Sequence, residues 1–189
     1  REEARQREYA WLTGDVRAED RATQYGHRAA IVLFTGSAQT GKTFLARRVE
    51  ALLVADSRHA YLLEGENLLQ GLDADLSAAD PSFAAERVRR YGEVARLLID
   101  TGLIVVSTSK TFGINYQRMA EMIRTLVQPA PVIAVHMSRA GEEPPPNTDL
   151  HFAGPQDFDA AARQILEELK RRGVLIQPSG TKSTIQYSI

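Results

Sequence analysis

The stretch LFTGSAQTGKTFLARR, residues 33–48, decides the fold. Apolar residues lead into Gly36, four residues separate it from Gly41, and Lys42 and Thr43 follow directly before a helical pattern. The spacing Gly-x4-Gly-Lys-Thr between a strand and a helix is typical of a loop that binds phosphate groups. The stretch therefore predicts a nucleoside triphosphate-binding loop.

Each part of this loop has a chemical task. Backbone N–H groups converge on a phosphate, the helix N-terminus adds partial positive charge, and the glycines permit backbone angles that other residues avoid. We expect Lys42 to act as a catalytic cation between the β- and γ-phosphates, and the Thr43 hydroxyl to bind Mg²⁺. The predicted nucleotide-binding residues are Gly36, Ser37, Ala38, Gln39, Thr40, Gly41, Lys42 and Thr43. The predicted cofactors are ATP and Mg²⁺.

Composition narrows the class of protein. The 189 residues carry a formal net charge of −1, so no bulk positive charge favours nucleic-acid binding. The absence of cysteine excludes disulfides, thiolate metal sites and cysteine nucleophiles. No apolar run approaches the roughly 18 residues of a membrane span, and the charged first 28 residues show no signal-peptide pattern. We expect a cytoplasmic domain with neither a nucleic-acid nor a membrane partner.

Apolar runs alternate with amphipathic stretches along the chain. Strands are expected at 29–36, 59–66, 103–109, 131–138 and 149–152, and helices at 44–56, 81–102, 116–127 and 157–173. This alternation predicts an α/β fold of the P-loop NTPase type, a parallel sheet of about five strands with helices on both faces. Ligands of such sheets bind beyond the carboxyl ends of the strands. Three polar stretches are expected there: 36–43, 64–67 and 107–113.

The domain organisation is predicted in three parts. Residues 1–28 are expected to form a lead-in or linker, 29–176 the main domain, and 177–189 a tail that is either an edge strand or disordered. The chain does not begin with Met, so we expect it to be part of a longer polypeptide.

Further motifs downstream give a family resemblance. YLLEGEN at 61–67 stands where the adenylylsulfate kinase family writes Tyr-Leu-Leu-Asp-Gly-Asp-Asn, followed by GL-x-x-DL at 71–76. RVRRYGEVARLLIDTGLIVV at 87–106 and PPPNTDL at 144–150 continue the pattern. The chain thus resembles this family, over roughly residues 15–175. The family's P-loop enzymes phosphorylate the 3′-hydroxyl of adenylylsulfate.

Two acids and three further residues are candidates for the rest of the site. Glu64 is the candidate general base for the acceptor hydroxyl and Glu66 supports Mg²⁺ through water, although these roles are exchangeable. The alternative is that both acids are solvated groups at a strand end, but their place opposite the phosphate loop favours the functional interpretation. The predicted acceptor-binding residues are Asn67, Arg87 and Lys110. Arg87 and Arg90 alternatively belong to a salt-bridged helix face with neighbouring glutamates.

Several positions depart from the family pattern where the acceptor should bind. Glutamates replace the two family aspartates, Leu69 replaces an arginine, and Arg87 replaces an asparagine. The family's long basic lid after the fourth strand is reduced to residues 139–143. Leucine cannot replace a cationic clamp for an anion, and a short lid excludes less water. We therefore expect sound ATP binding and a degenerate acceptor site.

The function that the resemblance implies is phosphoryl transfer from ATP to adenylylsulfate in sulfate activation, with impaired turnover. One alternative is a non-catalytic nucleotide-binding domain that regulates or scaffolds a sulfate-activation enzyme. Another is a related P-loop small-molecule kinase. The expected partners are ATP and adenylylsulfate, together with either a second copy of the chain or a fused sulfate adenylyltransferase module.

Overall fold

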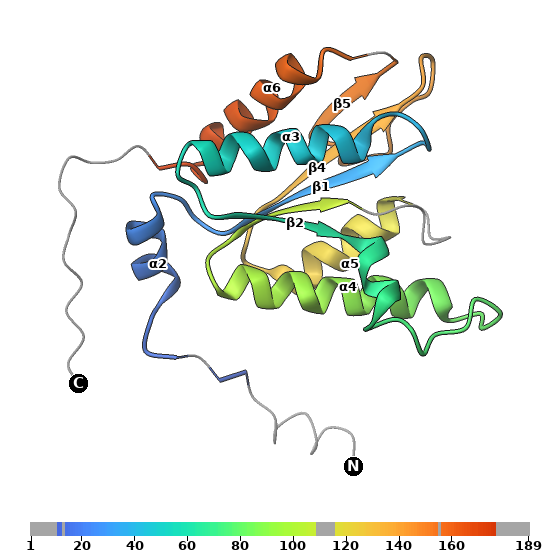
Figure 1. Ribbon diagram of the computed structural model, residues 1–189, viewed down its shortest axis with the longest axis horizontal. Helices are drawn as coiled ribbons and strands as arrows, with labels where there is room; N and C mark the ends of the chain where they lie inside the picture. Colours follow the sequence, from blue (N-terminus) through green and yellow to red (C-terminus); the bar gives the residue numbers. More distant parts are fainter. Residues whose placement is uncertain (1–10, 13, 109–115, 155, 177–189) are drawn as a thin grey trace.

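The centre of the molecule is a five-stranded sheet in the order β2-β3-β1-β4-β5 (Figure 1). The computed structural model describes residues 11–12, 14–108, 116–154 and 156–176. The strands are β1 Ala30–Gly36, β2 Ala60–Glu64, β3 Ile104–Thr108, β4 Val132–Ser138 and β5 Leu150–Ala153. Every pairing between neighbouring strands is parallel. The predicted five-stranded parallel sheet is confirmed.

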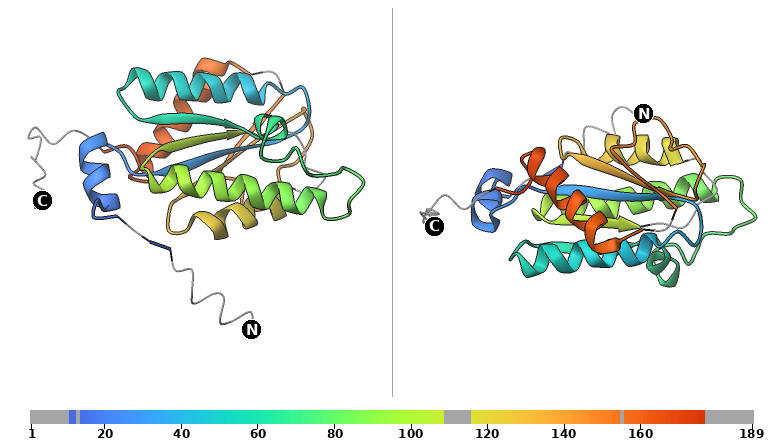
Figure 2. Two further views of the ribbon diagram at one scale, coloured as in Figure 1. Left: turned by 60° about the horizontal axis from the view of Figure 1, so that its bottom comes forward. Right: turned by 90° about the horizontal axis from the view of Figure 1, so that it is seen from above.

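Helices cover both faces of this sheet, as predicted. The helical elements are α2 Ala18–Tyr25, α3 Lys42–Ala55, η1 Gly65–Gln70, α4 Phe83–Asp100, α5 Tyr116–Val127 and α6 Phe158–Arg171. Helices α3 and α6 pack together on one face, and α4 and α5 pack together on the other (Figures 1 and 2). The three inner strands β3, β1 and β4 are buried along their whole length, and continuous apolar runs are typical of strands that are covered on both faces.

The apolar pattern explains the packing. Strand β1 is buried along its whole length, because it lies at the centre of the sheet between β3 and β4. Helix α3 buries Leu45, Val49 and Leu53 on one face of the sheet. Helix α4 buries Val88, Tyr91 and Ala95 on the other face. These residues form the core-facing stripes of the two helices.

The segment before the sheet is tied to the end of the described chain. Helix α2 lies within the predicted lead-in, and His27 forms an antiparallel bridge with Leu175. The backbone N–H of Arg28 donates to the carbonyl of Val174 at 2.8 Å. The predicted tail at 177–189 lies outside the described residues. None of the described helices combines the length and apolar character that a bilayer crossing needs.

Candidate active site

The phosphate loop follows β1 at the carboxyl end of the sheet (Figure 1). Gly36 and Gly41 have φ angles of 124° and 88°, which favour glycine. A Cβ on Gly36 would lie 1.8 Å from the Met137 carbonyl oxygen, and one on Gly41 2.6 Å from the Phe158 ring. Sequence reasoning missed that Gln39 also has a positive φ, 62°, because the motif leaves that position open.

Lys42 is folded back onto the loop that carries it. Its Nζ donates to the carbonyl of Gly36 at 2.8 Å and to the carbonyl of Ser37. The Thr40 hydroxyl donates to the same Ser37 carbonyl at 2.9 Å. Burial lowers the pKa of the Lys42 ammonium. The ammonium of Lys42, the predicted catalytic cation, is thus held by two carbonyl groups of the loop.

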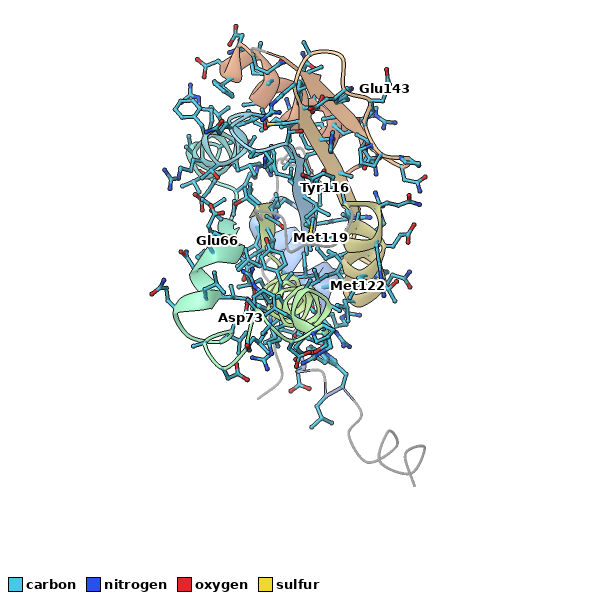
Figure 3. All side chains as sticks on the ribbon, turned by 90° about the vertical axis from the view of Figure 1, so that its right-hand side faces the viewer. Glu66, Asp73, Tyr116, Met119, Met122 and Glu143 are labelled. Atoms are coloured by element: carbon cyan, nitrogen blue, oxygen red, sulfur yellow. The ribbon has the colours of Figure 1, made fainter. Side chains whose placement is uncertain are left out.

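Two side chains from outside the loop hold its first residues. The Tyr116 hydroxyl, at the start of α5, donates to the Gly36 carbonyl at 2.7 Å. The Ser37 hydroxyl donates to Glu142 Oε2 at 2.6 Å, and this hydrogen bond lowers the pKa of the Glu142 carboxyl. Figure 3 looks onto this edge of the sheet and shows Tyr116 at the head of α5. Sequence reasoning missed both contacts, since they join segments about 80 and 105 residues apart.

A buried histidine lies behind Tyr116. His136 Nδ1 is 2.9 Å from the Thr35 hydroxyl, and its ring meets the Tyr116 ring edge-on at 5.3 Å. Burial lowers the pKa of the His136 imidazole, and the nearby His151 and Lys42 lower it further. The neutral imidazole therefore belongs to the packing that supports the loop.

Glu64 ends strand β2 and is held by the neighbouring strand. Thr108 pairs with Glu64 in the register of β2 and β3, and its hydroxyl donates to Glu64 Oε1 at 2.5 Å. Beneath them the buried Tyr91 hydroxyl donates to the Leu63 carbonyl at 2.8 Å and lies 2.6 Å from the Ser107 hydroxyl. Sequence reasoning did not single out Thr108 as an orienting residue; its place at the end of the adjacent strand was the available signal.

Glu66 and Asn67 lie on η1, immediately after Glu64. Glu66 is half-buried and Asn67 is exposed. Figure 3 shows Glu66 on the same edge of the sheet as Tyr116, on the side of β2. Leu69, at the position where the resemblance predicts an arginine, is 37% exposed on the same short helix. No cation therefore extends from this position toward an acceptor.

Arg87 lies in a buried ion pair rather than on an exposed helix face. Its Nε donates to Asp73 Oδ2 at 3.2 Å and its guanidinium donates to the Gly65 carbonyl at 3.3 Å. Arg87 is 5% exposed and Asp73 2% exposed. The salt bridges within the helix instead include the partly buried Arg90, which pairs with Glu86 at 2.9 Å. The charge of Arg87 is thus already balanced by a carboxylate.

The remaining predictions are one acceptor-binding residue and the two Mg²⁺ ligands. Lys110 lies outside the described residues. Within the described ranges, no group of three or more His, Cys, Asp or Glu side chains forms a metal cluster. The oxygen donors of Thr43 and Glu66 fit Mg²⁺, which is usually held by one or two protein oxygens together with phosphates and water.

Comparison with known proteins identifies the family. The family model described as adenylylsulphate kinase matches residues 28–144, more than half of the chain. The chain belongs to this family. The match includes the phosphate loop, Glu64, Glu66 and Arg87.

Curated members of the family are similar along much of the chain. The adenylyl-sulfate kinase of Yersinia pestis is 29% identical over 87% of this chain and 89% of the relative. That of Shewanella amazonensis is 38% identical over 68% of this chain and 63% of the relative. That of Aeromonas hydrophila is 38% identical over 62% of this chain, so the match spans 57% of that relative.

Solved structures agree on the fold of the family. A mutant APS kinase from Mycobacterium tuberculosis superposes with a TM-score of 0.66 at 29% identity, over 76% of this chain and 99% of that chain. The hexameric APS kinase from Thiobacillus denitrificans gives 0.65 at 24% identity, over 81% of this chain and 31% of that chain. The predicted P-loop kinase fold is confirmed.

Proposed function

We propose that this protein transfers the γ-phosphoryl group of ATP to the 3′-hydroxyl of adenylylsulfate, and does so slowly. The observation that carries the proposal is the shared edge of the sheet: the loop with Lys42 follows β1, and Glu64 ends β2 two strands away. Membership of the family supplies the substrates, since a related Mycobacterium tuberculosis structure is described as a complex with AMPPNP and APS.

The chemistry follows from the positions of the two groups. Phosphoryl transfer needs charge stabilisation and an aligned acceptor rather than covalent chemistry from the protein. Lys42 and the loop amides bind the β- and γ-phosphates. Glu64 takes the proton of the acceptor hydroxyl, and the hydrogen bond from Thr108 fixes its carboxylate. Thr43, and Glu66 through water, would hold Mg²⁺, which would neutralise phosphate charge.

Three features support slow transfer. Leu69 offers no positive charge to an anionic acceptor. Arg87 is neutralised by Asp73, so its remaining attraction for an anion is weak. Only residues 139–143 separate the end of β4 from the proline-rich turn that leads to β5, where the resemblance leads us to expect a long lid, and a short segment leaves the phosphates more exposed to water.

The alternative of a non-catalytic nucleotide-binding domain rests on the same observation about Arg87. A domain that only senses ATP needs the phosphate loop and has no requirement for an acceptor site. A kinase with a different small-molecule acceptor is the third hypothesis, because the phosphate loop places no restriction on the acceptor. Assembly as a homodimer or fusion to a sulfate adenylyltransferase module also remains a prediction.

One assay separates these functions. Release of ADP from ATP is measured with and without adenylylsulfate, for the wild type and for Lys42→Ala. Slow release that depends on adenylylsulfate and is lost in Lys42→Ala supports the proposal. ATP binding without any such release supports the non-catalytic domain, and absence of ATP binding by calorimetry overturns both.

A further inference from the structure

The two carbonyl groups that hold Lys42 each have a second side-chain donor. The Gly36 carbonyl accepts from Lys42 at 2.8 Å and from the Tyr116 hydroxyl at 2.7 Å. The Ser37 carbonyl accepts from Lys42 and from the Thr40 hydroxyl at 2.9 Å. Each oxygen therefore keeps a hydrogen bond if the lysine leaves.

This arrangement matters because Lys42 has two tasks that exclude each other. Its ammonium donates to carbonyl oxygens that are partly withdrawn from water. To bind phosphate oxygens it must release those carbonyls, and an oxygen left without a donor in a partly buried place is costly. A hydroxyl already in position removes that cost.

We propose that Tyr116 is a positioning residue that retains the Gly36 carbonyl while Lys42 moves to the phosphates of ATP, with Thr40 serving the Ser37 carbonyl in the same way. This inference rests on the proposed nucleotide site and extends it to a residue outside the loop motif. Tyr116 acts on nucleotide through Lys42 and the loop.

The surroundings of Tyr116 suit this task. The hydroxyl comes from α5, a helix that packs against α4 across the sheet from α3, so it does not move with the loop helix. Its ring is supported edge-on by His136. Burial, with a smaller contribution from Glu142, raises the pKa of the Tyr116 phenol, so the group stays a donor across the neutral range.

The test is a double-mutant cycle on nucleotide affinity, measured by calorimetry with ATP and with AMP. Tyr116→Phe removes only the hydroxyl and should weaken ATP binding on the order of three- to tenfold, the effect of one hydrogen bond. In a Lys42→Ala background the same change should alter ATP affinity less than twofold, because no lysine is released. AMP, which lacks β- and γ-phosphates, should be affected little in either background.

Controls separate this role from a structural one. Tyr61→Phe, at an exposed tyrosine on β2, should leave ATP affinity unchanged. Thr40→Val removes the second donor of the Ser37 carbonyl. It should weaken ATP binding when Lys42 is present and much less in the Lys42→Ala background. This variant tests the proposal even if Tyr116→Phe does not fold. Equal weakening in both lysine backgrounds, or unchanged ATP affinity in Tyr116→Phe, would overturn the inference. Absence of ATP binding in the wild type would instead refute the nucleotide site itself.

Discussion

At the carboxyl edge of the sheet, the segment after β1 is held mainly by backbone conformation and backbone carbonyls. The segment after β2 is held mainly by side-chain hydrogen bonds and an ion pair. The phosphate loop depends on positive φ angles at Gly36 and Gly41 and on carbonyls that receive Lys42. The proposed acceptor half, around β2 and η1, contains a buried pair, Arg87 with Asp73, and the Glu64 carboxylate, which accepts a hydrogen bond from the Thr108 hydroxyl.

This difference gives a physical reason to expect that the phosphate loop keeps the family pattern while the proposed acceptor half departs from it. A phosphate group is bound by amides that every residue supplies, so the loop tolerates Ser, Ala, Gln and Thr between its glycines. An acceptor is recognised by particular side chains, so a single replacement such as Leu69 changes its affinity directly. Substitutions in the acceptor half should therefore change acceptor binding or turnover while leaving ATP affinity intact.

The largest effect is expected at Glu64. Glu64→Gln removes the base without removing the side chain, so phosphoryl transfer to adenylylsulfate should fall about 10²–10⁴-fold while ATP affinity stays nearly constant. Single-turnover rates and calorimetry measure the two quantities. Glu66→Gln, two residues along the chain, is the matched variant. If turnover is intact in Glu64→Gln and lost in Glu66→Gln, then Glu66 is the base and Glu64 supports Mg²⁺.

The buried pair should be the next most sensitive feature. Asp73→Ala leaves the Arg87 charge buried without a carboxylate, and such a change typically costs about 3–5 kcal/mol of unfolding free energy. Urea denaturation measures this loss. Asp75→Ala, which breaks the more exposed pair with Arg90, should cost at most about 1 kcal/mol.

A second variant sharpens the interpretation of that loss. Combining Asp73→Leu with Arg87→Met removes both charges and should recover much of the stability, because no uncompensated charge remains. If the double replacement is as unstable as Asp73→Ala, packing volume rather than charge explains the effect. The ion pair would then contribute little to the stability of the β2 side of the sheet edge.

A smaller effect is expected from restoring the missing cation. Leu69→Arg adds a charge-assisted hydrogen bond of about 1.5–3 kcal/mol, which corresponds to a tenfold to hundredfold gain in adenylylsulfate affinity. ATP affinity should not change. Turnover should recover little, because residues 139–143 still stand in place of a long lid. Leu72→Arg, at another exposed leucine close by, controls for added charge alone. Tight adenylylsulfate binding and fast transfer in the wild type would contradict the degenerate acceptor site.

The sequence predicted the fold because its signals are repeated along many residues. Five apolar runs and four amphipathic stretches each report on the same layered arrangement, and the observed elements begin and end within a few residues of the predicted ones. The clearest shift is at β2, which ends at Glu64 because residues 65–70 turn into the short helix η1. Such local turns carry little periodic signal.

The site was predictable only where a motif specifies it. The Gly-x4-Gly-Lys-Thr spacing located the loop, but the contacts that hold it come from Tyr116 and Glu142 on distant segments. Likewise, the burial of Arg87 depends on Asp73, 14 residues earlier. Pairings of this kind depend on how loops pack, and no regular spacing in the sequence reports on them.

The smallest expected effect lies beneath the phosphate loop, at His136. Its folded-state pKa is lowered below the ordinary value of 6.5, chiefly by burial. The unfolded chain therefore binds the proton more readily, so this contribution to stability is complete above about pH 6.5 and is lost as pH falls below it. The buried His27 has a lowered pKa too and adds to the same trend.

The pH dependence of the unfolding free energy tests whether His136, beneath the phosphate loop, makes the protein less stable in acid. Between pH 6.5 and 5 the wild type should lose stability, and His136→Gln should show a shallower loss because one buried neutral imidazole is gone. The carboxyl pKa of Glu86 is lowered to about 2 by its arginine partners, so its contribution is lost only as pH falls below about 4.5 and does not overlap this window. An unchanged slope in His136→Gln would mean that the packing behind Tyr116 tolerates a charged imidazole, and that acid sensitivity does not distinguish the two halves of the edge.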